Sequence, residues 1–216
     1  MSQKLLNCLC CKSKNLITTF DLDKQPLANS FSSKKLNEKY ELKLNLCKDC
    51  FHSQLDQSID PSVMFDDYVY VSGTSKKLNE YFKSFSKKVE IEFNKRLNVL
   101  DIASNDGTLL KLFKSNGHNV LGIDPAKNLY EISKSQGIDT ICNYWPLPKD
   151  VRLEKTFDVV IAMNVVAHVS NPSGFINEIR NYIHKKSKIY IQTSQSEMFV
   201  NNEFDTIYHE HISFFN

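Results

Sequence analysis

The sequence lacks the features that mark nucleic-acid-binding, membrane and secreted proteins. Its 27 Lys and Arg are matched by 25 Asp and Glu, and a net charge of +2 is not the basic excess of a dedicated nucleic-acid binder. No stretch approaches the ~18 apolar residues of a membrane span, and the N-terminus has no apolar signal-peptide region. We therefore expect a cytoplasmic protein with neither nucleic acid nor membrane as a partner.

Signs of disorder and repetition are missing too. Hydrophobic residues make up 41% and aromatic residues 11% of the chain, which is enough to fill a core. No internal repeat or low-complexity tract interrupts the 216 residues, a length that suits one medium domain plus a small one.

Glycine is scarce, and it is missing where a dinucleotide-binding turn needs it. Residues 98–101 form a mostly apolar run that ends in an acid, and small or polar residues follow. Of the three fingerprint positions, only Gly107 is glycine, because Ala103 and Asn105 fill the other two. These replacements hinder the close backbone approach of a pyrophosphate. A smaller ligand without phosphates, such as S-adenosylmethionine, needs that approach less.

The stretch 98–125 nevertheless has the pattern of half a nucleotide-binding βαβ unit. Apolar residues recur at helical spacing after the turn, namely Leu109, Leu110, Leu112 and Phe113. Gly117 stands where a helix C-cap belongs, and residues 120–123 form a second buried strand. Asp124 at the tip of that strand can hold two ribose hydroxyls. The alternative is an ordinary βαβ unit that binds no ligand.

Cysteine is the clearest chemical signal near the N-terminus. Two C-x-x-C pairs, Cys8 with Cys11 and Cys47 with Cys50, can supply four thiolates to one tetrahedral, structural zinc. Reduced thiols are expected in the cytoplasm, which favours metal over disulfides. Cys10 could replace a ligand of the first pair. We expect Cys142, on a predicted strand, to be a core residue.

The remaining pattern predicts a doubly wound α/β sheet with ligands at the carboxyl ends of its strands. Strands are expected at 16–20, 40–46, 139–142, within 155–162 and at 188–192, and a loop at 60–74. Helices are expected at 75–96, at 126–136 and from Asn171-Pro172 through Ile183. In the first of these, Leu78, Phe82, Phe85, Val89 and Phe93 form one apolar stripe.

The last stretch, residues 204–215, contains the run Tyr208, His209, Glu210 and His211. Adjacent ligands rarely reach one ion, and the i, i+4 spacing of metalloprotease histidines is absent. Acid–base chemistry suits the run better, because His titrates near neutral pH while Tyr and Glu can orient it or stabilise an oxyanion. The alternative is a solvated loop with aromatic anchors.

Several motifs together resemble one family, the zinc-containing, S-adenosylmethionine-dependent C-methyltransferases of nucleotide-linked deoxysugars. The resemblance rests on the two C-x-x-C pairs and on PLANSF, DYVYVSGTS, DIASNDGTLL, GIDPAKN, NVVAHVSNP and FDTIYHEHISFF. It implies a Rossmann-like class I methyltransferase core behind a small zinc-binding domain. The expected domains are 1–58 (zinc-binding), 59–96 (loop and linking helix) and 97–216 (methyltransferase).

By this resemblance the cofactors are S-adenosylmethionine and a structural zinc, and the substrate is a nucleotide sugar. The methyl donor is held by Asp101, Ala103, Asn105, Asp106, Gly107, Asp124, Pro125 and Asn164. The catalytic residues are His211, Tyr208, Glu210, His168 and Tyr70. His211 removes the proton next to the keto group, and the enolate attacks the sulfonium methyl.

Two expectations qualify this function. Family members continue beyond the YHEH motif, so we expect the final sheet strands to be missing. We then expect the chain either to bind the methyl donor weakly or to need a partner polypeptide that supplies the C-terminal half. The alternatives are an O- or N-methyltransferase acting on another small molecule, and a truncated, non-catalytic zinc- and donor-binding module.

Overall fold

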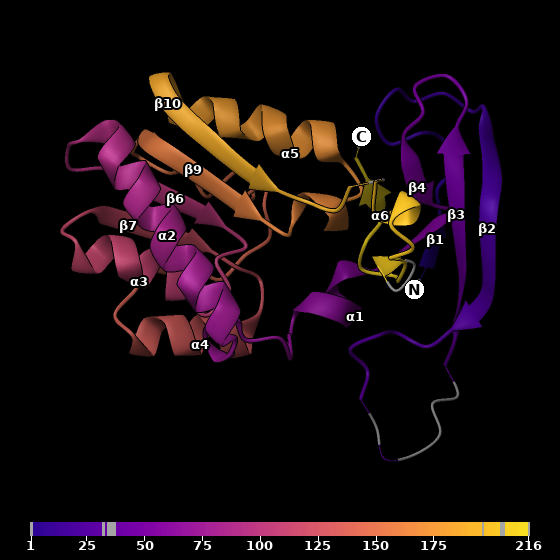
Figure 1. The fold of residues 1–216 in the computed structure, drawn as a ribbon, viewed down its shortest axis with the longest axis horizontal. Helices are drawn as coiled ribbons and strands as arrows, with labels where there is room; N and C mark the ends of the chain where they lie inside the picture. Colours follow the sequence, from indigo (N-terminus) through magenta and orange to yellow (C-terminus); the bar gives the residue numbers. More distant parts are fainter. Residues whose placement is uncertain (1, 32, 34–37, 196, 204–205, 216) are drawn as a thin grey trace. The chain divides into compact units, whose positions relative to one another are not determined.

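The computed structural model describes residues 2–31, 33, 38–195, 197–203 and 206–215 (Figure 1). Phe204 and Asp205, the first two residues of the predicted tail motif, lie outside this part of the chain. The chain forms two compact units. The first unit contains residues 1–64, 164–173 and 192–216, and the second contains 65–163 and 174–191.

A five-stranded sheet forms the centre of the second unit. Its strands, in spatial order, are β10 (Ile183–Gln192), β9 (Phe157–Met163), β6 (Asn98–Ile102), β7 (Asn119–Ile123) and β8 (Thr140–Ile141). β6 pairs in parallel with both β7 and β9, and β7 pairs in parallel with β8. This order, with the first strand in the middle, is that of the predicted doubly wound fold, which is confirmed.

Apolar side chains of two helices cover one face of this sheet. Helix α2 (Lys76–Phe93) begins at Ser75, whose hydroxyl caps the Leu78 N–H, and helix α3 is Thr108–Ser115. The predicted stripe of α2 packs into the cluster that holds Val99 of β6 and Ile161 of β9. Among the described residues, no helix is both long and apolar enough to cross a bilayer.

The helix ends follow their glycines. α3 closes with the N–H groups of Gly117 and His118 donating to the Lys114 and Phe113 carbonyls, and Gly117 has a φ of +87°. This is a Schellman motif, which requires a left-handed residue. Helix α4 (Lys127–Ser135) ends in the same way at Gly137, whose φ is +74°.

Three details of the second unit differ from the sequence-based expectation. Helix α5 (Pro172–Ile179) ends earlier than predicted, and Ile183 opens β10 after the 3-10 turn η3 (Arg180–Tyr182). Cys142 is exposed rather than a core residue, because it follows β8, the short strand at the sheet edge. Residues 60–74 are partly helical, with α1 (Pro61–Phe65) and η1 (Ser72–Thr74).

The first unit contains two small antiparallel sheets. The larger has the order β11 (Ser213–Phe214), β4 (Ser53–Leu55), β3 (Tyr40–Cys47) and β2 (Leu16–Gln25), and the smaller pairs β1 (Ser2–Lys4) with β5 (Gln57–Ile59). The tail strand β11 therefore completes a sheet whose other strands lie near the N-terminus. This pairing was not expected from the sequence order.

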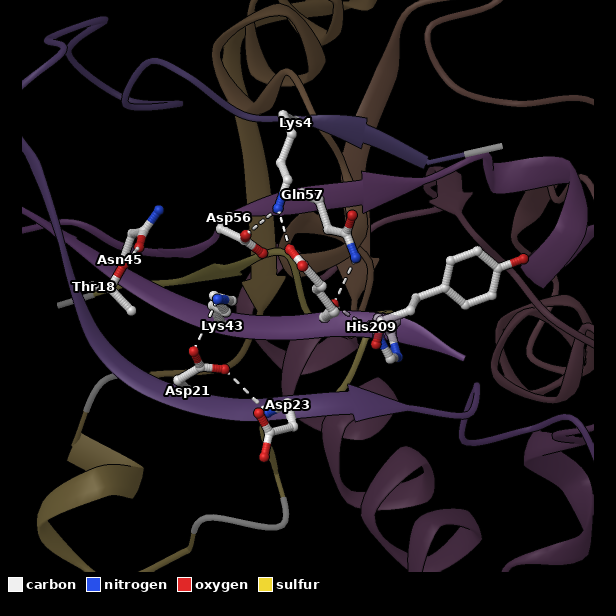
Figure 2. A network of polar contacts seen from close by, with 11 residues as sticks. Lys4, Thr18, Asp21, Asp23, Lys43, Asn45, Asp56, Gln57 and His209 are labelled. Carbon is white, nitrogen blue, oxygen red and sulfur yellow. Dashed lines mark hydrogen bonds and ion pairs between the residues drawn. The ribbon is translucent and has the colours of Figure 1, made fainter. Parts of the chain in front are cut away.

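A polar network links the strands of the first unit (Figure 2). Lys4 forms ion pairs with Glu41 and Asp56 at 2.6 and 2.7 Å. The Gln57 amide donates to the Glu41 carbonyl at 2.6 Å, and His209 Nε2 lies 3.2 Å from the same oxygen. His209 of the tail therefore supports the backbone of β3.

Candidate functional site

The four paired cysteines converge in the first unit. The sulfur atoms of Cys8, Cys11, Cys47 and Cys50 all lie within 4.8 Å of one another. Cys8 and Cys50 are 3.5 Å apart, and Cys11 and Cys47 are 3.6 Å apart. Zinc–sulfur bonds of about 2.3 Å in a tetrahedron separate the sulfurs by about 3.8 Å. The donor set therefore fits a structural zinc with no position left for a substrate.

The backbone of both cysteine pairs is bent in the same way. The residue after each pair, Lys12 or Phe51, has a φ of +64° or +61°. Its N–H donates to the carbonyl of the first cysteine of the pair, Cys8 or Cys47, at 3.0 and 2.9 Å. Two matched knuckles thus present their thiols to one point. Cys10 is exposed and lies outside the cluster, so the first pair is Cys8 and Cys11.

The turn after β6 forms the candidate binding site for the methyl donor in the second unit. Ala103, Asn105 and Gly107 all adopt left-handed backbone conformations, with φ values of +62°, +54° and +78°. Only Gly107 of these three alternate positions is glycine. Ala103 and Asn105 therefore adopt the conformation that glycine favours without being glycine, at a cost of roughly 1–2 kcal/mol at Ala103.

Buried acids surround this turn. Asp124 at the end of β7 accepts the Asn105 N–H at 2.8 Å and the Ala126 N–H at 2.9 Å. Burial raises the pKa of the Asp124 carboxyl, although these two N–H groups oppose the shift. Burial raises the pKa of Asp101 well above its ordinary value, and the nearby Asp124 adds to this. Such buried acids can hydrogen-bond hydroxyl groups of a ligand and disfavour a phosphate.

Asn105 and Asp106 hold a second segment against the turn. The Asn105 side chain accepts the Ser72 N–H at 2.8 Å and donates to the Tyr70 carbonyl at 2.9 Å. Asp106 accepts the Gly73 N–H at 3.0 Å. Asn105 and Asp106, which were predicted to hold the methyl donor, therefore use these side-chain atoms to fix residues 70–73.

Residues 66–74, which we call the strap, are also fixed at their other end. The Asn128 amide accepts the Tyr68 N–H at 3.1 Å and donates to the Tyr68 carbonyl at 2.8 Å. The Tyr144 hydroxyl donates to Asp66 at 2.7 Å. Tyr70, held between these anchor points, is 46% exposed and keeps its ring available to a ligand. Pro125 follows Asp124, and its carbonyl lies 3.6 Å from the Cys142 sulfur.

The tail histidine His211 lies in the first unit with one nitrogen fixed. Its Nδ1 atom is 3.0 Å from the Thr206 carbonyl and 3.2 Å from the Ser194 hydroxyl. Since a carbonyl can only accept a hydrogen bond, Nδ1 carries the proton of the neutral ring. Nε2 therefore has the lone pair, and it accepts the Tyr208 hydroxyl at 3.0 Å.

Burial keeps this histidine neutral and the tyrosine protonated. Burial lowers the pKa of His211, although the bond to Thr206 opposes the shift. It raises the pKa of Tyr208 to about 12, with a further contribution from Glu210. The Tyr208 and His211 rings are 4.3 Å apart. The pair is thus a neutral base in contact with a neutral hydroxyl donor.

The other predicted catalytic residues of the tail region also lie in the first unit. The ring of His168, in the 3-10 turn η2 (Val166–His168), is 5.1 Å from His211, and burial lowers the pKa of His168 to about 3. Buried Glu210 accepts a hydrogen bond from the Asn29 amide. Asn164, exposed after β9, has a φ of +55°. Asn164 thus also belongs to the first unit. Tyr70 and the remaining residues predicted to hold the methyl donor belong to the second unit.

Some residues of the site were not assigned a role from the sequence. Ser194 and Thr206 orient His211, Asn29 holds Glu210, and Asn128 holds the strap. Asn29 and Asn128 lie in the PLANSF and GIDPAKN motifs. These motifs contributed to the family resemblance, but no role was assigned to the two asparagines. Ser194 and Thr206 act through contacts that no local pattern reveals.

Comparisons with protein families match both parts of the chain. Residues 8–65 match a family described as "Putative zinc binding domain", and residues 70–216 match a family described as "Methyltransferase domain".

Two relatives are enzymes that transfer methyl groups. The C-methyltransferase NovU of Streptomyces niveus is 25% identical over 182 residues, which cover 82% of this chain and 43% of NovU. A ubiquinone biosynthesis O-methyltransferase of Rickettsia typhi is 29% identical over 112 residues, which cover 50% of this chain and 46% of that enzyme. The chain thus spans less than half the length of either relative.

Solved structures share the fold. The PH0226 protein of Pyrococcus horikoshii matches with a TM-score of 0.52 at 18% identity, covering 68% of this chain and 69% of that chain. The plantazolicin methyltransferase BpumL, solved in complex with a triazolic desmethylPZN analogue and SAH, also matches with a TM-score of 0.52, at 17% identity. That match covers 63% of this chain and 54% of BpumL.

Proposed function

Since this chain belongs to the methyltransferase-domain family, we propose that it transfers a methyl group from S-adenosylmethionine to a carbon atom of a nucleotide-linked keto-deoxysugar. The observation that carries the proposal is the geometry of His211, whose Nδ1 is tied to the Thr206 carbonyl while Nε2 keeps a lone pair. Methylation of carbon needs such a base, because a carbon nucleophile must first lose a proton. The relative NovU, a C-methyltransferase, supports the same reaction class.

The donor is assigned to the turn after β6. Buried Asp124 can accept the two ribose hydroxyls in addition to its backbone partners, and buried Asp101 lies close enough to Asp124 for the two carboxyls to interact. When bound, S-adenosylmethionine supplies an electrophilic methyl on a sulfonium sulfur. Asn105 and Asp106 hold the strap and so position Tyr70, and exposed Asn164 is assigned to the amino-acid end of the donor.

The residues of the tail then act on the sugar. His211 Nε2 takes the proton from the carbon next to the keto group, and the electron pair of that C–H bond forms the enolate. As Nε2 takes this proton, the Tyr208 hydroxyl gives up its hydrogen bond to Nε2 and donates to the enolate oxygen instead, while a pKa of about 12 keeps Tyr208 protonated. The enolate carbon forms the new C–C bond as the donor's C–S bond breaks, and the pair remains on sulfur. His168, whose ring is 5.1 Å from that of His211, and the neighbouring Glu210 are assigned to positioning the base.

Proton exchange without methyl donor tests the base directly. The protein is incubated in D₂O with a panel of keto-deoxysugar nucleotides, and deuterium at the carbon next to the keto group is followed by NMR. We expect exchange with the native chain, and a loss of about 10²–10⁴-fold in His211→Ala. His184→Gln is the matched control, because His184 lies at the start of β10 and takes no part in the proposed site. Equal exchange in His211→Ala would remove His211 as the base.

Methyl transfer itself tests the reaction class. With S-adenosylmethionine added, the product should gain one methyl, and NMR should place it on carbon. An O- or N-methyl product would support the second candidate, which the O-methyltransferase relative favours. No product with any acceptor would favour a non-catalytic binding module. A required partner polypeptide also stays a prediction, tested by adding candidate chains to the same assay.

A further inference from the structure

The two zinc knuckles and the catalytic tail are connected by strand β4, which lies between them in the first unit. In register, Gln54 of β4 pairs with Ser213 of β11, and Ser53 pairs with Phe214. The Leu55 N–H also donates to the Ile212 carbonyl at 2.8 Å. Residue 212 directly follows the proposed base, His211. The tail is thus fixed to the strand that follows the second knuckle.

The side chain of Gln54 joins this strand to the first knuckle. Gln54 is fully buried, and its amide uses both polar atoms. Its oxygen accepts the Leu9 N–H at 2.8 Å, and its nitrogen donates to the Asn7 carbonyl at 3.2 Å. Leu9 lies between Cys8 and Cys11. The position of the first knuckle therefore depends on β4.

His52 joins the second knuckle to the tail directly. It stands two residues after Cys50, and its carbonyl accepts the Cys47 N–H at 2.9 Å. Its buried Nε2 lies 3.2 Å from the hydroxyl of fully buried Ser213. The His52 ring is also 5.3 Å from that of Phe215. One residue thus contacts both the metal-binding turn and the tail strand.

We propose that the zinc centre orders the catalytic tail, and that Gln54, His52 and Ser213 are the positioning residues that couple them. The role of the tail in this inference rests on the proposed function. A zinc with four thiolate ligands performs no chemistry itself, but it fixes both knuckles. Through β4 it then holds residues 206–215 in the arrangement in which Tyr208 and His211 meet. Because coupling between two sites is reciprocal, a weakened tail must also weaken zinc binding.

The reciprocal direction gives the sharpest test. Ser213→Ala removes only a buried hydroxyl, and zinc affinity is measured by competition with a chromophoric chelator. We expect zinc to bind about fivefold more weakly, which is the factor that one buried hydrogen bond contributes. The matched control is Ser86→Ala, the same substitution at another buried hydroxyl, which donates to the Lys83 carbonyl at 3.2 Å within α2 of the second unit. Equal zinc affinity in the two variants would overturn the proposal.

The forward direction is followed by hydrogen exchange in zinc-loaded protein. In His52→Phe, which keeps a ring beside Phe215, amides of residues 206–215 should exchange about fivefold faster while zinc stays bound. His52→Gln, whose amide can still reach Ser213, should restore part of the protection. Amides of residues 98–125 should be unaffected. Unchanged protection of the tail in zinc-loaded His52→Phe would contradict the coupling.

Kinetics distinguish this inference from the proposed function. If the chain transfers methyl groups, Ser213→Ala should lower kcat while KM for the methyl donor stays the same. If the native chain transfers none, the proposed function fails, yet zinc affinity and tail exchange still decide the coupling. A Ser213→Ala variant with lower kcat but native zinc affinity and tail protection would overturn the coupling alone.

Discussion

At the scale of single residues, chemistry in this chain depends on which atom of a side chain is already occupied. The Thr206 carbonyl accepts the hydrogen bond of the protonated Nδ1 of His211, and this leaves on Nε2 the lone pair that the proposed base needs. The neighbouring His209 differs, because its Nε2 lies 3.3 and 3.2 Å from the Tyr40 and Glu41 carbonyls of β3. The two histidines of one motif therefore differ in which ring nitrogen is hydrogen-bonded to a backbone carbonyl, Nδ1 in His211 and Nε2 in His209.

The pH dependence of the reaction follows from this environment. Burial lowers the pKa of His211 below the ordinary 6.5, so the neutral, basic form persists into mildly acidic solution. We expect kcat/KM to be constant around neutral pH and to fall only below pH 6.5. Tyr208 keeps its proton up to about pH 12, so it should cause no alkaline decline near neutrality. The measurement is a pH–rate profile, and an acid limb centred above 6.5 would argue against His211.

At the scale of elements, turns and caps decide where side chains can meet. The turn after β6 brings three left-handed residues together, and only one of them is glycine. Asparagine adopts this conformation readily, whereas alanine does so at a cost. The turn is held in return by the buried carboxylate of Asp124 and by the strap.

Gly107, the one glycine of this turn, should be hard to replace. It has a φ of +78°, and an added Cβ would lie 2.7 Å from the Ser133 hydroxyl and 3.2 Å from Ile138. We expect Gly107→Ala to lower the free energy of unfolding by roughly 2–4 kcal/mol, from backbone strain plus overpacking. Gly117→Ala is the control, with a φ of +87° but open space around it, and should cost only about 1 kcal/mol. Urea denaturation measures both, and equal losses would refute the steric part.

Asn128 should control the strap. Asn128→Ala removes both hydrogen bonds to the Tyr68 backbone, so limited proteolysis should cut residues 66–74 faster. Donor affinity, measured by calorimetry, should fall about tenfold, since two hydrogen bonds no longer hold the strap beside the turn. Asn116→Ala is the control, because that amide bonds Glu90 at the end of α3. A strap that resists protease equally in both variants would disprove this role.

At the scale of the whole molecule, local patterns predicted much of the fold and less of the site. The strand that contains Asp101, the strand before Asp124 and the helix caps at Gly117 and Gly137 follow from short-range rules, and the structure confirms them. The predictions that Cys142 is a core residue and that Ile183 lies in a helix were wrong. The reason is that the position of a strand at the sheet edge and the end of α5 both depend on packing. The contact of Asn29 with Glu210 joins residues 181 apart. No periodicity can predict such a contact.

Asp158 should make the stability of the second unit depend on pH. Burial alone would raise the pKa of its carboxyl, but bonds to Lys95 at 2.5 Å and to the Asn98 N–H at 2.8 Å outweigh it, so the pKa is lowered. A lowered carboxyl pKa stabilises the fold above the unfolded value, and the contribution disappears as pH falls through the folded value.

We therefore expect Asp158→Asn to lose about 1–2 kcal/mol at pH 7, a modest figure because the Lys95 side chain is half exposed. The loss should shrink below about pH 4. Urea denaturation of both proteins at pH 7 and pH 3 measures it. A difference that is the same at both pH values would show that charge is not the cause.

The pairing of β4 with β11 also has a consequence for how the chain folds. His52 and Ser213 meet although they are 161 residues apart in the sequence. During synthesis the knuckles and β2, β3 and β4 emerge first, but β4 keeps an unpaired edge until the tail arrives. Contacts of such long range form late and slowly. The strands of the knuckles are thus synthesised well before the tail strand that completes their sheet, and they depend on protection from aggregation until it pairs.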